Sequence, residues 1–118
     1  MNTLSLRNKQ RYPRPQPRHI PGNMNKLEQQ YQQHLEVLKH AGEIIGYRFE
    51  AIKFRLADKT FYTPDFMVTL SDRIEFHEVK GFMRDDAAVK IKVVAEMFPE
   101  FVFYLCTYKN KLWTMEEK

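Results

Sequence analysis

The sequence contains little that suits export or a membrane. Its 118 residues include one cysteine, Cys106, so no disulfide can form within the chain. No apolar run approaches the roughly 20 residues of a membrane-spanning helix, and the N-terminal region has basic residues and prolines where a signal peptide is apolar. We therefore expect one compact domain in a reducing, cytoplasmic setting, because the chain is too short for two ordinary domains.

Acidic residues are absent from the first 27 positions, which carry six Lys and Arg side chains. The remainder has 13 basic and 15 acidic residues, so the net charge of +4 comes from the N-terminal part. Residues 11–22 read RYPRPQPRHIPG, and their four prolines favour extended structure without backbone pairing. We predict a basic arm over residues 1–22, followed by a folded domain over residues 23–118.

The arm has the composition of a segment that binds a polyanion, since its cations can neutralise phosphates and release counterions. Its predicted contacts to nucleic acid are Arg11, Arg14 and Arg18. A tail that only adds solubility, or is disordered, is the alternative.

The periodicity of the domain predicts helices and strands in alternation. A helix capped by Asn23 or Asn25 should run to about Ala41, because Leu27, Tyr31, Leu35 and Leu38 share one face and Gly42 suits a C-terminal cap. The following segments are predicted, in order, as one bent strand or two short ones over 44–56, strands over 60–70 and 74–80, a helix over 84–98, a central strand over 101–107 and an edge strand over 112–115.

Three charged residues stand where strands of this predicted meander can bring them together. Asp65 follows Pro64, which cannot donate to a sheet and so marks an edge, bulge or bend. Glu78 and Lys80 alternate with Val79, so they point to the same face of the last strand. Such a set predicts a Mg²⁺ site with Asp65, Glu78 and the carbonyl of Val79 as ligands, and with Lys80 orienting a water or offsetting charge on a phosphate.

The segments YTPDFMV and IEFHEVKG, followed by a helix with lysines, resemble the PD-(D/E)XK nuclease superfamily, whose signature Asp65, Glu78 and Lys80 match letter by letter. The resemblance covers about residues 23–107 and is strongest to small phage-encoded members. It implies an α/β, restriction-endonuclease-like α-β-β-β-α-β core with a mixed central sheet flanked by helices, dependence on Mg²⁺ or Mn²⁺, and cleavage of DNA. It also implies a further ligand from the first helix, which we assign to Glu28, with Glu36 as the alternative.

Other side chains are weaker candidates. Arg84 and Lys90 are predicted phosphate contacts, and Lys92 is a further possibility. His77, on the face opposite Glu78, is interpreted as structural or surface-exposed. The aromatic residues that could stack on bases, but that better suit the core and its rim, are Tyr12, Tyr47, Tyr62 and Trp113.

These observations favour a structure-specific DNA endonuclease of a bacterial or phage-infected cell, acting on branched DNA such as a Holliday junction during recombination, replication or repair. Cleavage of two opposed strands needs two active sites and so predicts a homodimer. A nicking or restriction-like nuclease is one alternative. The other is a non-catalytic nucleic-acid-binding module with a nuclease-like fold, against which the acidic cluster argues.

Overall fold

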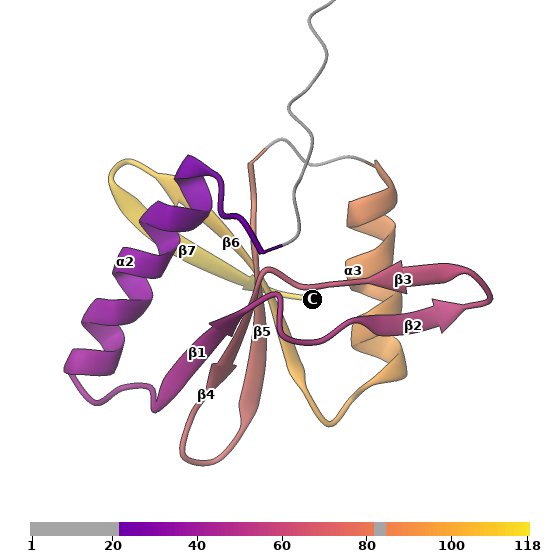
Figure 1. Cartoon of the computed structure of the whole chain (residues 1–118), viewed down its shortest axis with the longest axis horizontal. Helices are drawn as coiled ribbons and strands as arrows, with labels where there is room; N and C mark the ends of the chain where they lie inside the picture. The colour runs from indigo at the N-terminus through magenta and orange to yellow at the C-terminus, as the bar shows by residue number, and fades with distance from the viewer. Residues whose placement is uncertain (1–21, 82–84) are drawn as a thin grey trace, which may run out of the picture.

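The computed structural model describes residues 22–81 and 85–118 of the chain (Figure 1). In these residues the protein is an α/β structure with two helices and a mixed five-stranded sheet, which confirms the predicted class. The predicted arm lies outside the described residues, apart from Gly22. No helix in the described part of the chain is both long and apolar enough to cross a membrane.

Helix α2 spans Lys26–His40 and begins with a reciprocal cap. The Asn25 side chain accepts a hydrogen bond from the Glu28 amide at 2.7 Å, and the Glu28 carboxylate accepts one from the Asn25 amide at 2.9 Å. Gly42 follows the helix with a φ of 79°, as expected for a C-terminal cap. Asn25 is thus the correct one of the two predicted caps, and it fixes Glu28 in the first turn.

The five-stranded sheet has the order β1-β4-β5-β6-β7. The pairing of β5 with β6 is parallel, and the other three pairings are antiparallel. The interior position of β6, between β5 and β7, and the edge position of β7 agree with the predictions for the C-terminal strands. The strands are β1 (Gly46–Phe49), β4 (Phe66–Thr69), β5 (Ile74–Val79), β6 (Val102–Lys109) and β7 (Leu112–Glu117).

Strands β2 (Phe54–Ala57) and β3 (Thr60–Tyr62) follow β1 and precede β4 in the sequence, and they form a separate hairpin. The predicted single strand over residues 60–70 is therefore wrong, because β3 and β4 belong to different sheets and residues 63–65 separate them. Pro64 has no amide to continue a ladder, so the chain leaves one sheet and enters the next here. The segment over residues 44–56 forms two strands, β1 and β2, rather than one bent strand.

The two helices cover opposite faces of the sheet, with α2 on one side and α3 (Asp85–Met97) and the hairpin on the other (Figure 1). The core under α2 includes Tyr31, Phe66 and Val79. The core under α3 includes Phe76 and Ile91. Strand β5 contributes alternate residues to the two cores, with Val79 facing α2 and Phe76 facing α3.

Candidate functional site

Asp65 and Glu78 lie opposite each other on neighbouring strands. Asp65 directly precedes β4, whose first residue pairs with His77, so the antiparallel register places Asp65 beside Glu78. The Asp65 carboxylate accepts a hydrogen bond from the Val79 amide at 2.8 Å, and the Asp65 amide donates to Glu78 Oε1 at 3.3 Å. Both carboxylates are therefore held by backbone groups at the point where β4 begins and β5 ends.

Glu28 joins these two residues from the first turn of α2. Its side chain is buried, and it lies close enough to Asp65 and Glu78 for its negative charge to raise the pKa of both carboxyl groups. Glu36, the alternative in the sequence, is exposed and accepts a hydrogen bond from the Tyr47 hydroxyl instead.

The electrostatics of the cluster oppose ionisation. Burial raises the pKa of Asp65 far above its usual range, and the negative charges of Glu78 and Glu28 raise it further. Burial also raises the pKa of Glu78, although hydrogen bonds from Tyr62 and from the Asp65 amide oppose this shift. Among residues 22–81 and 85–118, no Lys, Arg or His side chain forms an ion pair with Asp65, Glu78 or Glu28. In the part of the chain that the structure describes, the carboxylates thus lie together without an ion-paired cation.

Tyr62 has a role that the sequence did not indicate. It ends β3, is buried, and donates its hydroxyl to Glu78 Oε1 at 2.7 Å. Burial, followed by the charge of Glu78, raises the pKa of this phenol, so it stays protonated and remains a donor. Pro64 was the signal available in the sequence, because it ends the strand pairing after Tyr62. The end of the hairpin then lies against β5.

Glu50 is a second residue that the sequence did not indicate. It follows β1 with a φ of 49°, a left-handed conformation that is uncommon for a residue with a side chain. Its amide donates to the Asp65 carbonyl at 2.8 Å, and its negative charge contributes to the raised pKa of Glu78. Its carboxylate accepts a hydrogen bond from the Gly22 amide at 2.8 Å, so Gly22, the last residue of the predicted arm, lies beside Glu50.

Lys80 follows β5 directly, and its amide donates to the Cys106 carbonyl at 2.8 Å. The pairing with β6 therefore extends to Lys80, and the alternation of side chains places it on the same face as Glu78, as predicted. The side chain is exposed. No ion pair in residues 22–81 and 85–118 joins it to Asp65, Glu78 or Glu28.

The remaining predicted site residues are Val79, Lys90 and four arginines that lie outside the described residues. Val79, whose carbonyl is a predicted metal ligand, contacts Asp65 through its amide. Lys90 is half-buried on α3, and no ion pair in the described part of the chain joins it to the cluster. The other predicted phosphate contacts lie outside the described residues; these are Arg11, Arg14, Arg18 and Arg84.

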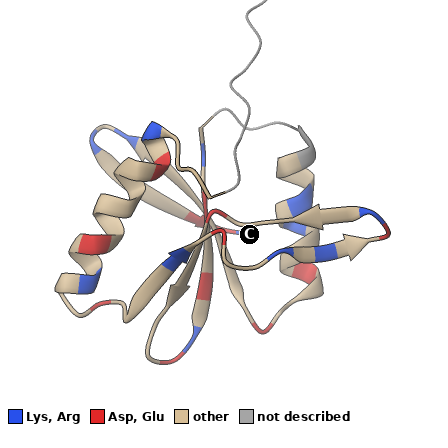
Figure 2. Cartoon of the chain, in the orientation of Figure 1, with Lys and Arg blue, Asp and Glu red and all other residues tan. Residues whose placement is uncertain are grey.

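The cluster fits a hard divalent cation by its chemistry. In residues 22–81 and 85–118, no group of three or more His, Cys, Asp and Glu side chains lies in an arrangement that could hold a metal ion. Mg²⁺, however, is usually held by one or two carboxylates, with waters and substrate phosphate oxygens completing its shell. A cation beside Asp65 and Glu78 would also relieve the repulsion that raises their pKa values. Acidic positions are found where the hairpin joins the sheet, near the centre of the view in Figure 2.

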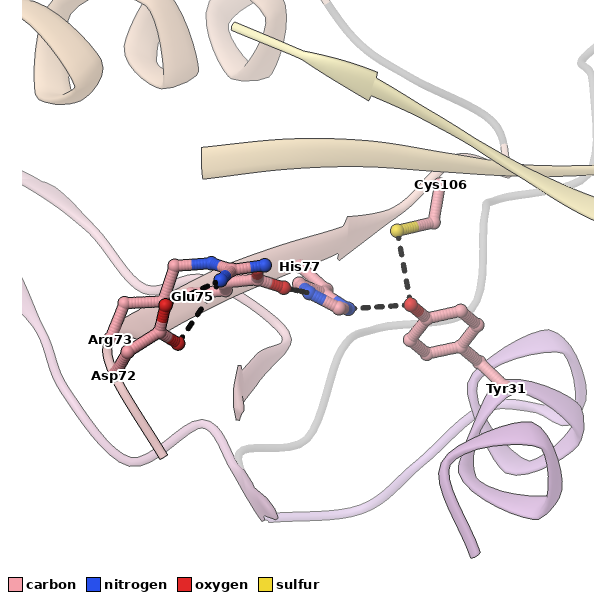
Figure 3. Close-up of polar contacts among 6 residues, drawn as sticks. All are labelled: Tyr31, Asp72, Arg73, Glu75, His77 and Cys106. Carbon is pink, nitrogen blue, oxygen red and sulfur yellow. Dashed lines mark hydrogen bonds and ion pairs between the residues drawn. The ribbon is translucent and has the colours of Figure 1, made fainter. Parts of the chain in front are cut away.

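A second polar cluster lies on the opposite face of β5, under α2 (Figure 3). His77 hydrogen-bonds through Nδ1 to the Tyr31 hydroxyl at 2.5 Å and through Nε2 to Glu75 at 2.9 Å. Glu75 also accepts a hydrogen bond from Arg73 at 2.6 Å, and the Cys106 thiol lies 3.2 Å from the Tyr31 hydroxyl. We refer to Tyr31, Arg73, Glu75, His77 and Cys106 as the His77 network.

The His77 network has the properties of a structural element. His77 is 2% exposed, so of the two predicted possibilities, structural and surface-exposed, the structural one is correct. Burial raises the pKa of Glu75, but hydrogen bonds from His77 and Arg73 outweigh this effect and lower the pKa below its ordinary value. Each polar group in the network therefore has a partner of complementary character.

Comparisons with known proteins add no identification. No protein-family model matches the chain, and neither a curated protein nor a solved structure does. The functional argument consequently depends on the geometry and charge of the site itself.

Proposed function

We propose that the protein is a magnesium-dependent DNA endonuclease, with Asp65, Glu78 and Lys80 as its catalytic residues and Glu28 as an additional acidic ligand. The observation that carries this proposal is the convergence of three carboxylates, from α2, from the residue before β4 and from β5, with which no cation of residues 22–81 and 85–118 forms an ion pair. Burying like charges together costs free energy, so such a cluster is expected where a function requires it. Mn²⁺ is expected to substitute for Mg²⁺.

The reaction is the hydrolysis of a phosphodiester. A water oxygen bonds to phosphorus while one ester P–O bond breaks, and the departing alkoxide takes up a proton to become a hydroxyl. Asp65 and Glu78 would hold the cation, which when bound would supply Lewis-acid polarisation of the phosphate and would lower the pKa of water. The hydrogen bonds of the two carboxylates with backbone amides and with the Tyr62 phenol keep them oriented. Lys80 orients the water or offsets the charge that develops on the phosphate.

The order of elements supports a restriction-endonuclease-like arrangement. With the hairpin set aside, the chain runs α2, β1, β4, β5, α3 and β6, which is the α-β-β-β-α-β order of the PD-(D/E)XK nucleases that the sequence resembles. Asp65 and Glu78 also occupy adjacent strands of the sheet, as that resemblance implies. The β2–β3 hairpin is then an insertion, and through Tyr62 it supplies a hydrogen bond to the site.

The substrate that we favour is branched DNA, such as a Holliday junction, in the cytoplasm of a bacterial or phage-infected cell. The chain is small and shows no helix-turn-helix or zinc-finger pattern, so recognition of backbone and shape is more economical than reading of a long base sequence. The positive charge of the arm supports a polyanionic partner. The hydrogen bond from the Gly22 amide to Glu50 places the C-terminal end of the arm near the carboxylates.

Cleavage of labelled DNA tests the proposal. The purified protein is incubated with four-way junction, flap, single-stranded and linear duplex DNA in Mg²⁺ or EDTA. We expect cleavage in Mg²⁺ alone, and we expect Asp65→Asn and Lys80→Ala to lose it. Matched controls are Asp58→Asn and Lys39→Ala, which alter an exposed carboxylate of the hairpin and an exposed lysine of α2.

Three results would contradict or redirect the proposal. Cleavage that persists in EDTA, or in Asp65→Asn, would exclude the metal mechanism. Tight binding of DNA without cleavage by the wild type would favour the non-catalytic binding module. Deletion of residues 1–21 is expected to weaken DNA binding and to flatten its dependence on salt, and unchanged binding would show that the arm has no part in it.

A further inference from the structure

Strand β7 presents an open edge. It pairs with β6 on one side, and within residues 22–81 and 85–118 no strand pairs with its other side. The Lys118 amide donates to the Phe103 carbonyl at 2.9 Å, which fixes the alternation of hydrogen-bonding groups along β7. By this alternation the backbone groups of Trp113, Met115 and Glu117 point away from β6, so they are available to another strand.

Apolar side chains are exposed around this edge. Leu112 is 67% exposed and Met115 is 42% exposed. Val37 of α2 is 66% exposed and lies one turn from His34, whose ring lies near that of Trp113. Such an edge, six residues long and flanked by exposed apolar groups, favours association with another strand.

We propose that β7 pairs antiparallel with β7 of a second copy of this chain, across a two-fold axis at Thr114. This register places Lys111 of each copy opposite Glu117 of the other, Trp113 opposite Met115, and Leu112 opposite Glu116. Lys111 lies in the turn directly before β7 and Glu117 ends the strand, so the antiparallel arrangement brings the basic residue of each copy to the acidic residue of the other. The two sheets become one continuous sheet of ten strands.

Neighbouring registers fit less well. With the axis at Trp113, Lys111 lies opposite Met115, and with the axis at Met115, Trp113 lies opposite Glu117. Each of these arrangements loses both the contact of Lys111 with Glu117 and the contact of Trp113 with Met115. These two contacts therefore favour the axis at Thr114.

If the protein is the proposed nuclease, the pairing also determines the distance and orientation between the two active sites of the dimer. Thr114 pairs with Thr107, and Cys106 pairs with Val79, so the axis passes at the level of Lys80. Five strand spacings separate β5 from its counterpart, which gives about 24 Å between the two sites. The axis is perpendicular to the sheet, so both sites lie on the same face and the strands that carry them run in opposite directions. The two antiparallel strands of a DNA duplex require this arrangement if both are to be cut.

The mass of the protein in solution, measured by light scattering during gel filtration, tests the interface without any reference to cleavage. We expect the wild type at twice the chain mass of 14.2 kDa in the micromolar range. Met115→Pro removes an outward amide and should give a monomer while leaving the β6 ladder intact, and Met115→Glu should do so without a change in backbone. Arg48→Glu, a charge reversal on the β1 edge, should remain dimeric. A monomeric wild type, or dimers in both Met115 variants, would overturn the proposal.

Charge reversal tests the register. Lys111→Glu and Glu117→Lys should each raise the dimer dissociation constant by about 3- to 10-fold, because each creates two like-charge contacts. The double variant should return to near the wild-type value. Failure of the double variant to recover would overturn the register at Thr114.

A supercoiled plasmid then separates the dimer from the nuclease. The wild-type dimer should linearise the plasmid by paired cuts, whereas monomeric Met115→Glu should still nick it but produce linear product only after nicks accumulate. Paired cutting by the monomeric variant would overturn the functional role of the dimer. Absence of all cleavage by a wild-type dimer would instead contradict the proposed function and leave the interface supported by the mass measurements.

Discussion

The two faces of β5 carry polar clusters of opposite character. On the α2 side, the His77 network matches each acid with a donor, and the pKa of Glu75 is lowered. Near the end of the strand, Asp65 and Glu78 face each other, receive no ion pair from the described residues, and have raised pKa values. The first cluster is electrostatically complete in the folded chain, whereas the second would be completed by a cation.

This difference shows how a structural network and a functional one can be separated without homologues. Burial alone does not distinguish them, since Glu75 and Asp65 are 5% and 7% exposed. The balance of charge does, because selection for stability alone would not retain a buried, unbalanced group of carboxylates. The contrast predicts that substitutions in the two clusters act on different properties: stability in the His77 network, and activity in the carboxylate cluster.

The largest expected effect on stability comes from His77→Ala. The change removes partners of both Tyr31 and Glu75 and leaves a cavity, so the free energy of unfolding should fall by about 3 kcal/mol. Urea unfolding followed by circular dichroism measures this change. His40→Ala, in the exposed last turn of α2, is the control and should cost about 0.5 kcal/mol. Equal losses in the two variants would show that the His77 network contributes no special stability.

The second prediction concerns the hydroxyl of Tyr62. Tyr62→Phe removes only the donor to Glu78 Oε1, so we expect cleavage to slow by about 10- to 100-fold, with a higher Mg²⁺ concentration needed for half-maximal rate. Tyr47→Phe removes a hydroxyl that donates to Glu36 and should leave the rate unchanged. A change in rate without any shift in Mg²⁺ dependence would contradict a role through Glu78.

These residues also show how far the sequence alone could lead. The first helix was predicted with its cap because Asn25 and the spacing of Tyr31 and Leu35 are local signals. Asp65 and Glu78 could be placed together because a short meander constrains its neighbours in space. Local patterns of this kind determine elements and the pairings of adjacent strands.

The interactions that support the site could not be predicted in the same way. Tyr62 reaches Glu78 only because the hairpin leaves the main sheet and packs beside α3, an arrangement set by tertiary contacts. Glu50 depends on a left-handed backbone conformation that its sequence does not signal. The pairing of His77 with Tyr31 joins residues 46 positions apart, and a period-two pattern gives the face of His77 but not its partner.

The third prediction is a gain of stability in the carboxylate cluster. Glu78→Gln removes a negative charge beside Asp65 while keeping an oxygen that can accept from Tyr62, so the free energy of unfolding at pH 8 should rise by about 1 kcal/mol. Glu75→Gln is the matched change in the His77 network and should lower it instead, because it weakens the bonds to Arg73 and His77. The same chemical change should thus have opposite signs on the two faces of β5. Destabilisation by Glu78→Gln would contradict the account of repulsion.

The smallest expected effect is a pH-dependent response to magnesium. The raised pKa values of Asp65 and Glu78 mean that the folded state binds more protons than the unfolded state above the ordinary carboxyl pKa of about 4. Stability without metal should therefore decline as pH rises from that value through the raised pKa values, and Mg²⁺ should restore it mainly at the alkaline end. With Mg²⁺ at about three times its dissociation constant at pH 8, the melting temperature should rise by about 3 °C, with a smaller rise at pH 5. Asp65→Asn should abolish the rise while Asp58→Asn preserves it, and an equal rise in all three proteins would mean that Mg²⁺ acts elsewhere.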